Sequence, residues 1–375
     1  MNRFNFHERN LPANTIAYFK PTIITLLFTL LAPQITLAQE ITIASWGGAY
    51  EYAQRKAIFD PFEQLTGIKI NTQLQKGGLG MLSGKSIPDL VDMEGEDAQS
   101  ACQQSLLLEL DFKELVAPAN HSMEQPTPAA NDFLNQSFSP CGIAHLTFST
   151  LIAFKPSAFP GKKPQIIDDF FDLASFPGKR GLRKSPGTIL EWALMAQGVP
   201  MSQVYDLLST KRGLKLAFRR LETIREHIVW WEKPEQAGKL LADNAVVMTS
   251  GYNGRFFDAQ SPTNPLIMLW DGQLIDRGFW VIPASHKVLR PEIEQFIRFA
   301  TRPEQMAKLA EYIPYGPTRR SALEHIGNHF EKGTPMRGHL PTASHHLHRA
   351  LMRDTSWYAH TEQLRKKAFE RWLAE

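Results

Sequence analysis

Motifs of the common enzyme classes are missing from this 375-residue sequence. It contains no G-x-S-x-G nucleophile elbow, no phosphate-binding G-x-x-x-x-G-K-[ST] loop, no H-E-x-x-H and no C-x-x-C. The Gly-rich run over 77–80 lacks a Lys-Ser/Thr pair at the required spacing and a strand-turn-helix context, so we interpret it as a flexible loop. These absences favour a protein that binds a molecule without converting it.

A strong charge of either sign is absent once the first residues are set aside. Three basic residues precede an apolar run over 22–32 and small residues at 36–38, which is the layout of a secretory signal peptide. We predict that residues 1–38 are removed and that the mature chain is periplasmic. The alternative is a membrane anchor, but the uncharged stretch is near the lower length limit for a span and contains a proline.

The predicted mature chain is nearly neutral, with 38 Lys+Arg against 37 Asp+Glu. It also has no long basic run, so nothing in its charge indicates binding to nucleic acid. Its length suffices for two domains, and a hydrophobic content of 43% indicates an ordinary globular core.

Cysteine is rare, since only Cys102 and Cys141 occur. In an exported protein an isolated pair favours a disulfide over a metal site, which requires more ligands. Two buried thiols remain the alternative, because sequence spacing does not establish proximity. Neither interpretation makes either cysteine a nucleophile.

Histidines form one cluster, at His345, His346 and His348. On a helix, positions 345 and 348 share a face, and two imidazoles can hold a metal ion. No carboxylate follows at ligand spacing before Asp354, so we interpret the cluster as a solvated helix start and expect no metal and no cofactor. A periplasmic metal-dependent hydrolase that uses this cluster is the alternative from the enzyme class.

Hydrophobic periodicity predicts alternating strands and helices, the rhythm of an α/β fold. Pro61 marks a break inside the first helix, and the Pro/Gly/Lys-rich stretch over 156–164 marks a crossing between lobes. Thr301 and Glu304 have the spacing of a capping box. The predicted strands cover 41–44, 68–72, 88–92, 143–154, 246–249, 266–270 and 278–282, and the predicted helices cover 50–65, 214–228 and 356–373 and begin near Glu96 and Thr301.

Aromatic and acidic side chains follow several of these strands. In an open α/β sheet a ligand binds beyond the carboxyl ends of the strands, so these positions are candidates for a pocket. Aromatic rings suit alkyl chains and cations, and carboxylates suit ammonium groups. Core packing is the alternative for each ring, and a helix start stabilised by its dipole is the alternative for the acids. The candidates are Trp46, Tyr50, Trp231 and Tyr252, with the acids Glu94, Glu96, Glu191 and Asp276.

Longer segments resemble the spermidine/putrescine receptors among the ABC solute-binding proteins. They include SWGGAYEYAQRKAIFDPFEQLTGIKI (45–70), PDLVDMEGEDAQSAC (88–102), CGIAHLTFSTLIAF (141–154), FPGKRGLRKSPGTILEWAL (176–194), VVMTSGYNGR (246–255) and WDGQLIDRGFWVIP (270–283). The resemblance implies a type II periplasmic binding fold, whose two α/β lobes close on a small cationic solute by a hinge motion. It further implies delivery to an ABC permease, a monomer, and a disulfide between the two cysteines.

The resemblance also predicts which segments form each lobe. Residues 39–147 and 268–320 are expected in the first lobe, and residues 148–267 and 321–375 in the second. It places Trp46, Tyr50 and two acids, Glu94 and Glu96, in the first lobe's wall. Glu191, Trp231 and Tyr252 then fall on the second lobe's side.

One departure from the resemblance weakens the expectation of a polyamine ligand. Relatives often carry Asp-x-Asp-aromatic-Trp where this chain has Asp276-Arg277-Gly278-Phe279-Trp280. If position 278 faces the cleft, one ammonium anchor is missing, and Arg277 could clamp a carboxylate. An amino acid, an opine-like conjugate or a monoamine is therefore the alternative ligand class.

Overall fold

The computed structural model describes residues 39–116 and 129–375. The predicted signal peptide, residues 1–38, lies outside this part of the chain, and the described residues belong to one compact unit. Within the described ranges, no helix is long and apolar enough to cross a membrane.

The described strands join in one mixed sheet. Their bounds are β1 Glu40–Ser45, β2 Lys69–Leu74, β3 Leu90–Glu94, β4 Phe138–Ser139, β5 Gly142–Phe154, β6 Arg180–Arg183, β7 Ile228–Trp231, β8 Met248–Tyr252, β9 Ile267–Val281, β10 Gly316–Pro317 and β11 Leu351–Met352. The main order is β2-β1-β3-β9-β5-β8-β6-β7, while β4 and β10 pair with β5 and β11 pairs with β9. The pairs of β1 with β2 and β3 are parallel, as are those of β6 with β7 and β8.

Helices follow most strands, as the α/β pattern predicts. Their bounds are α1 Gly48–Gln54, α2 Asp60–Thr66, α3 Gly95–Gln103, α4 Ile189–Met195, α5 Val204–Leu208, α6 Lys211–Glu222, α7 Pro234–Ala242, α8 Asn253–Ala259, α9 Pro291–Ala300, α10 Pro303–Ala310, α11 Ala322–His325 and α12 Thr355–Ala374. A π-helical segment, Arg55–Phe59, separates α1 from α2, and Pro61 lies in the first turn of α2. The chain therefore stays helical through all three segments, and the irregularity expected at Pro61 is a π-helical segment directly before it.

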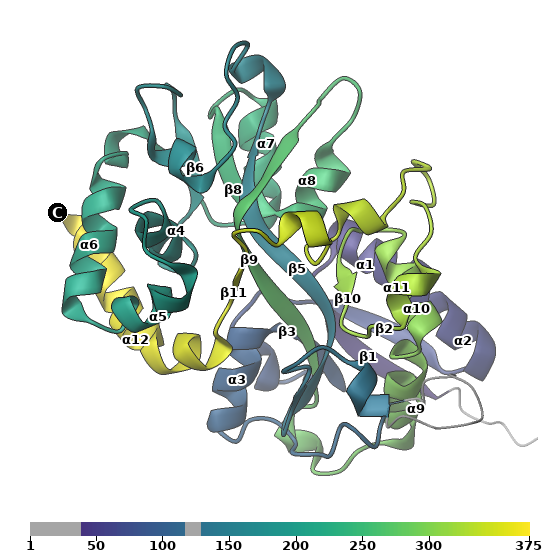
Figure 1. The fold of residues 1–375 in the computed structure, drawn as a ribbon. Coiled ribbons are helices and arrows are strands. Elements are labelled where there is room, and N and C mark those ends of the chain that lie inside the picture. Colours follow the sequence, from purple (N-terminus) through teal and green to yellow (C-terminus); the bar gives the residue numbers. More distant parts are fainter. Residues whose placement is uncertain (1–38, 117–128) are drawn as a thin grey trace, which may run out of the picture. The chain divides into compact units, whose positions relative to one another are not determined.

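The long antiparallel pair β5 and β9 joins two hydrophobic cores (Figure 1). The first core contains Ile41, Phe62 and Ile297, and the second contains Trp192, Leu221 and Trp372. We call the parts built on these cores the first lobe and the second lobe. The first half of β5 pairs with β10, whereas its second half pairs with β8, so the chain passes from one lobe to the other inside this strand.

Strand β9 corrects the prediction of two separate strands over 266–270 and 278–282. The Asp271-Gly272 pair is typical of a turn, and Gly272 does have a positive φ of 78°. Strand β5 nevertheless pairs with the chain on both sides of it, with a register shift between Thr150 and Ile152. The glycine therefore sits in an irregularity of one continuous strand.

Several further details of the elements differ from the predictions. Helix α6 ends at Glu222 because Ile228 begins β7, so the predicted 214–228 helix is too long. The predicted capping box is wrong, since Arg302 precedes α10 and the Thr301 hydroxyl donates to Ile297 O, 2.7 Å away, at the end of α9. Strand β8 begins two residues later than predicted, at Met248.

The segment after β10 packs differently from the predicted lobe division. Ala322, Ile326, Met336 and Leu340 lie in the first core, because α11 packs against α10. The predicted boundary at residue 320 therefore falls inside the packing of the first lobe. Helix α12 packs with the second core through Phe369 and Trp372.

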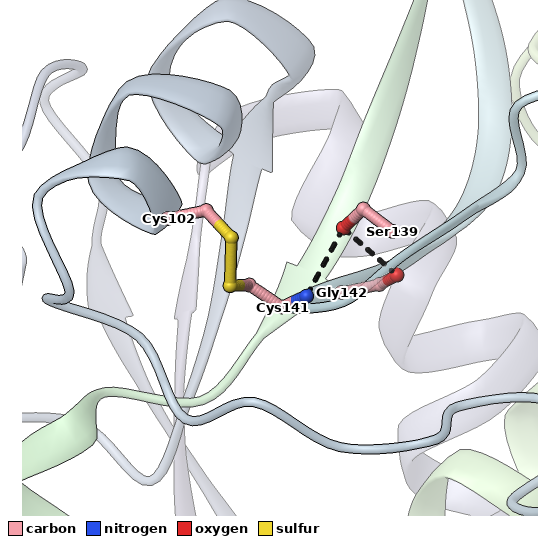
Figure 2. Close-up of a disulfide and its surroundings, with 4 residues drawn as sticks. All are labelled: Cys102, Ser139, Cys141 and Gly142. Carbon is pink, nitrogen blue, oxygen red and sulfur yellow. Dashed lines mark hydrogen bonds between the residues drawn. A yellow bond between two sulfur atoms is a disulfide. The ribbon is translucent and has the colours of Figure 1, made fainter.

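A disulfide joins Cys102 and Cys141, with their Cα atoms 5.7 Å apart (Figure 2). Cys102 lies near the end of α3, and Cys141 lies directly before β5. Beside the disulfide, the Ser139 hydroxyl accepts a hydrogen bond from the Cys141 N–H and donates one to the Gly142 carbonyl. The pairing predicted for the two cysteines is present.

Candidate functional site

The carboxyl ends of β3, β6, β7 and β8 converge on one small cavity between the lobes. The carboxyl ends of the parallel strands β6, β7 and β8 share one edge in the second lobe. Strand β3 of the first lobe runs in the opposite direction, because three antiparallel pairings separate it from β8, so its carboxyl end approaches them from the other side. The residues that line the cavity are Glu96, Thr150, Arg183, Ser185, Gly187, Thr188, Ile189, Trp192, Trp231, Ser250, Tyr252 and Arg353.

The first lobe contributes acids from the β3–α3 junction. Glu94 ends β3, and Glu96 and Asp97 lie in the first turn of α3, where acids are favoured by the helix dipole. Burial raises the pKa of Asp97 to about 7, aided by the charges of Glu94 and Glu96, although the Gly78 N–H donates to its carboxylate at 2.7 Å. Burial also raises the pKa of Glu96. This wall therefore concentrates negative charge in a poorly solvated place.

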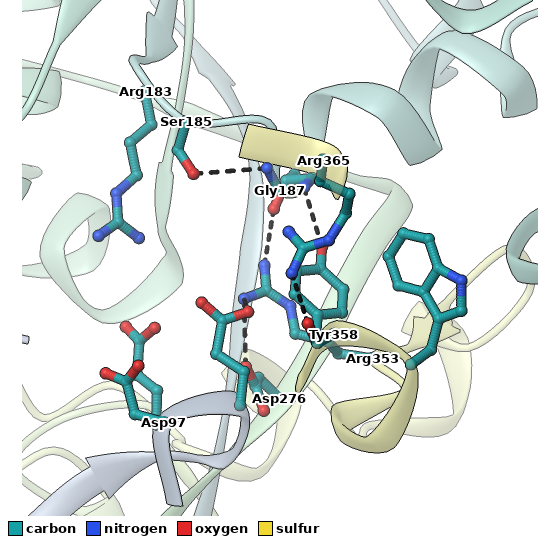
Figure 3. Close-up of polar contacts among 12 residues, drawn as sticks. Asp97, Arg183, Ser185, Gly187, Asp276, Arg353, Tyr358 and Arg365 are labelled. Carbon is teal, nitrogen blue, oxygen red and sulfur yellow. Dashed lines mark hydrogen bonds and ion pairs between the residues drawn. The ribbon is translucent and has the colours of Figure 1, made fainter. Parts of the chain in front are cut away.

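The second lobe contributes a cation at the end of β6. Arg183 Nη1 donates to the Tyr252 hydroxyl at 2.8 Å, and that hydroxyl donates to Glu94 Oε1 at 3.2 Å. The Tyr252–Glu94 bond thus joins the two lobes. In Figure 3 the Arg183 guanidinium points toward the acidic side chains at Asp97.

A second cation, Arg353, comes from the chain between β11 and α12. Its Nη1 lies 3.3 Å from Asp276 Oδ2 and 3.7 Å from Glu96 Oε2, and its Nη2 donates to Thr188 Oγ1 at 2.7 Å. Figure 3 shows it between Asp276 and the turn at Gly187. Arg353 therefore contacts acids of one lobe and a hydroxyl of the other.

Thr188 has the strained backbone that often marks a functional turn. Its φ is +72°, a left-handed conformation that a β-branched residue rarely adopts. Tyr358 stabilises it, because the Thr188 N–H donates to the Tyr358 hydroxyl at 3.1 Å. The Tyr358 ring lies between two guanidinium groups, 4.6 Å from Arg353 and 4.1 Å from Arg365. Helix α12 thus fixes the shape of the second lobe's turn.

The structure brings together half of the residues predicted as a site. Glu96, Trp231 and Tyr252 line the cavity, and Glu94 is hydrogen-bonded to Tyr252. Trp231 is buried, and its indole N–H donates to the Ser250 hydroxyl at 3.2 Å. Ligand contact by these four residues remains a proposal that their placement supports.

The other four predicted residues lie away from the cavity lining. Tyr50 is buried in the first core, and its hydroxyl donates to Asp92. Trp46 packs against the same core, and the buried Glu191 accepts the hydroxyl of Tyr358. Asp276 is also buried, behind its ion pair with Arg353. These side chains support the walls, and sequence position alone could not separate support from lining.

The condition set for Gly278 and Arg277 is not met, because neither residue lies at the cavity. A Cβ at Gly278 would lie 3.1 Å from Leu146 and 3.3 Å from Asp92, so this position faces the interior of the first lobe. Arg277 donates to Asn135 O at 3.1 Å and does not line the cavity. The cations of the cavity are Arg183 and Arg353 instead.

Two histidines of the cluster lie on a short 3-10 helix, Ser344–His346, with the ring centres of His345 and His346 4.0 Å apart. His346 is buried and stacks on Trp270 with ring centres 3.7 Å apart, and its Nδ1 lies 2.8 Å from Leu340 O. Burial lowers the pKa of His346 to about 4. Among the described residues, no group of three or more His, Cys, Asp or Glu side chains is placed to hold a metal ion.

Sequence reasoning missed Arg183, Thr188 and Arg353. Arg183 could have been found, because it ends a strand just before a turn, as the aromatic candidates do. Thr188 follows a Pro-Gly pair that signals only a turn. Arg353 carries no local signal, since it lies outside any long periodic element.

The cavity is small in this structure, about 20 Å³. A space of that size holds a water molecule and no amino acid or polyamine. A ligand therefore requires the lobes or the lining side chains to move apart, as the hinge fold allows.

The chain resembles known binding proteins over most of its length. A family model described as bacterial extracellular solute-binding protein matches residues 57–334. The chain is 33% identical over 345 residues to the gamma-aminobutyric acid-binding protein of Pseudomonas aeruginosa, covering 90% of this chain and 92% of that one.

Two solved structures extend this likeness to the fold. An ABC transporter substrate-binding protein from Bradyrhizobium japonicum USDA 110 superposes with a TM-score of 0.75 at 28% identity, covering 90% of this chain and 99% of that chain. A PBP of A. tumefaciens B6 in complex with glucopine superposes with a TM-score of 0.77 at 24% identity, covering 89% and 99%. The two-lobed periplasmic binding fold is confirmed by these neighbours.

Proposed function

Because this chain belongs to the family of bacterial extracellular solute-binding proteins, we propose that it captures a small molecule carrying both an amine and a carboxylate. The relatives named above are solute-binding proteins of transport systems and not enzymes. We further propose that the mature chain works in the periplasm and delivers its ligand to an ABC permease.

The observation that carries this proposal is the opposite charge of the two cavity walls. Arg183 uses one nitrogen for Tyr252, and within the described ranges its other guanidinium N–H groups have no protein acceptor. They are free for a ligand carboxylate, which a guanidinium binds through paired hydrogen bonds. Glu96 lines the same space from the first lobe, Glu94 reaches its edge through the Tyr252 hydroxyl, and Asp97 lies next to Glu96 in α3. These carboxylates suit an ammonium group.

This arrangement favours the amino-acid and opine-like alternative over a polyamine. A polyamine carries only positive charge, and it would lie against two guanidinium groups, those of Arg183 and Arg353. Burying like charges together is costly unless each is paired. The relative that binds gamma-aminobutyric acid supports the same choice.

Binding and closure are coupled because the two charged walls belong to different lobes. A ligand that bridges Arg183 and the β3–α3 acids interacts fully only when the lobes are closed, so it shifts the population toward the closed state. The Tyr252–Glu94 bond already joins the lobes at this point. The aromatic side chains Trp192, Trp231 and Tyr252 line the space between and suit a short alkyl chain.

Titration calorimetry of the mature chain tests the proposed function. The protein should first be unfolded and refolded, which removes any ligand carried through purification. We expect gamma-aminobutyric acid or an opine such as glucopine to bind, and putrescine and spermidine to bind at least tenfold more weakly. Tighter binding of putrescine than of every amino acid and opine would overturn the proposal.

Replacement of Arg183 by methionine should weaken the binding of gamma-aminobutyric acid. Losing a charged hydrogen-bond donor typically costs about 1.5–3 kcal/mol, which is roughly tenfold to 150-fold in affinity. Arg219→Met is the matched control, because Arg219 is exposed on α6 in the same lobe. Equal affinities of wild type and Arg183→Met would remove Arg183 from the site.

Removal of the Asp97 carboxyl should change how stability depends on pH. Its raised pKa means that the native state holds a proton which the unfolded chain loses near the ordinary value of 3.8. Stability from this group is therefore present at low pH and is lost as the pH rises toward about 7. The melting temperature of Asp97→Asn relative to wild type should rise from pH 5 to pH 8.

Asp172→Asn is the control for that measurement. Hydrogen bonds from Ser175 and Ala174 lower the pKa of the half-buried Asp172, so its protonation state does not change between pH 5 and pH 8. Its melting temperature relative to wild type should stay constant over this range. A constant difference for Asp97→Asn would show that the Asp97 carboxyl is ionised throughout.

A further inference from the structure

Arg353 occupies a position that is otherwise built for a ligand cation. Its side chain is 7% exposed and lies between the carboxylates of Asp276 and Glu96, both from the first lobe. The same guanidinium lines the cavity, as does Glu96. The Arg353 guanidinium thus occupies the place beside Asp276 and Glu96, at the wall of the cavity, where a positively charged ligand group would otherwise fit.

The fit between this guanidinium and the acids is poor. Asp276 Oδ2 and Glu96 Oε2 are buried without a hydrogen-bond partner, and the Arg353 Nε is likewise unpaired. Arg353 Nη1 lies 3.3 Å from Asp276 Oδ2 and 3.7 Å from Glu96 Oε2. It does not form the paired hydrogen bonds that a guanidinium makes with a carboxylate. Burial still raises the pKa of Asp276 to about 7 beside this cation. Arg353 therefore balances the negative charge of Asp276 and Glu96, but it leaves these two buried oxygens, Asp276 Oδ2 and Glu96 Oε2, without a hydrogen-bond donor.

An ammonium group would use that capacity better. It carries three donors on a compact centre, and the two orphaned oxygens offer it acceptors. The acids Glu94 and Asp97 flank Glu96 at the start of α3. Without the Arg353 guanidinium, Asp276 and Glu96 would be available to a second amine in addition to Glu94 and Asp97, so the acids of this wall would suffice for both amines of a short diamine.

We propose that Arg353 is a specificity-determining residue that takes the place of a second ligand ammonium and so excludes diamines. The inference rests on the proposed function in one respect, the use of the β3–α3 acids by a ligand amine. It goes beyond that function because it assigns the rejection of diamines to one side chain held by α12 and Tyr358.

The test compares the binding of putrescine by wild type, Arg353→Met and Arg353→Lys. Arg353→Met should bind putrescine about tenfold to 100-fold more tightly than wild type, because charge-assisted hydrogen bonds to Asp276 and Glu96 become available. Arg353→Lys keeps the cation and should not gain affinity. The double variant Arg353→Met/Asp276→Asn should lose the gain. Unchanged putrescine affinity in Arg353→Met, or a gain that survives Asp276→Asn, would overturn the proposal.

Loss of folding does not leave the proposal untested. If Arg353→Met is unfolded alone, putrescine should restore its native circular dichroism by binding the native state, and it should not restore the double variant. Failure of putrescine to restore Arg353→Met overturns the inference. The proposed function fails on a different result, the absence of amino-acid and opine binding to wild type, which leaves the putrescine comparison intact.

Discussion

Replacing Arg180 by methionine should lower the free energy of unfolding by about 3–5 kcal/mol. The side chain is fully buried at the start of β6, and its guanidinium donates to the carbonyls of Phe170 and Gly178 at 2.8 Å and also to that of Phe176. Burial lowers the pKa of Arg180 to about 10, but the guanidinium still remains charged at neutral pH. Methionine fills much of the volume and leaves these carbonyls without a donor, at about 1–3 kcal/mol each.

Urea unfolding followed by circular dichroism measures this loss. Arg183→Met is the matched control, since Arg183 lies on the same strand, is only partly buried and makes one hydrogen bond, to Tyr252. The control should lose at most about 1.5 kcal/mol of stability while losing ligand affinity. Arg180→Lys should also destabilise, because a single ammonium does not reproduce the planar fork. A stability of Arg180→Met within 1 kcal/mol of wild type would contradict the structural role.

Replacing both Cys102 and Cys141 by serine should cost about 3–4 kcal/mol of stability. The disulfide closes a loop with a sequence separation of 39, and opening it increases the conformational freedom of the unfolded chain. It also joins the end of α3 to the start of β5, so it holds the helix that carries Glu96 and Asp97. The expected result is a lower urea midpoint with a larger m-value, because the unfolded state becomes more extended.

A reductant provides the control for the disulfide. Wild type with dithiothreitol should unfold at the midpoint of the double serine variant, and the variant itself should not respond to the reductant. A midpoint of the variant equal to that of oxidised wild type would mean that the cross-link adds no stability.

The strands and helices of this chain follow from local patterns. The β-branched run over 41–44 became β1, and the apolar run over 143–154 became β5, because strand formation depends on residue type and on burial of both faces. Local patterns predicted the wrong strand ends where hydrogen bonds to a partner strand decided the conformation. Strand β9 continues through Asp271-Gly272 because β5 offers hydrogen bonds on both sides of that pair.

The candidate site was predictable only in part. The rule that ligands bind beyond strand ends found Trp231 and Tyr252, since their position depends on where a strand stops. The same rule gave Tyr50 and Glu191, but the structure buries both side chains. The Tyr50 hydroxyl donates to Asp92, and Glu191 accepts a hydrogen bond from the Tyr358 hydroxyl. Whether a side chain after a strand turns inward or toward the ligand depends on neighbours from other segments.

The amino-acid sequence by itself determined the α/β elements, the polar and aromatic strand ends and the availability of two cysteines, because these depend on neighbours within a few residues. Only the tertiary structure decided that Arg183 faces the acids of β3–α3 and that Arg353 enters the acidic pair of Asp276 and Glu96. Electrostatic pairing acts through space between segments that lie far apart in the chain, and its strength depends on burial. The charge of the cavity, on which the proposed class of ligand rests, therefore came from the packing of the two lobes.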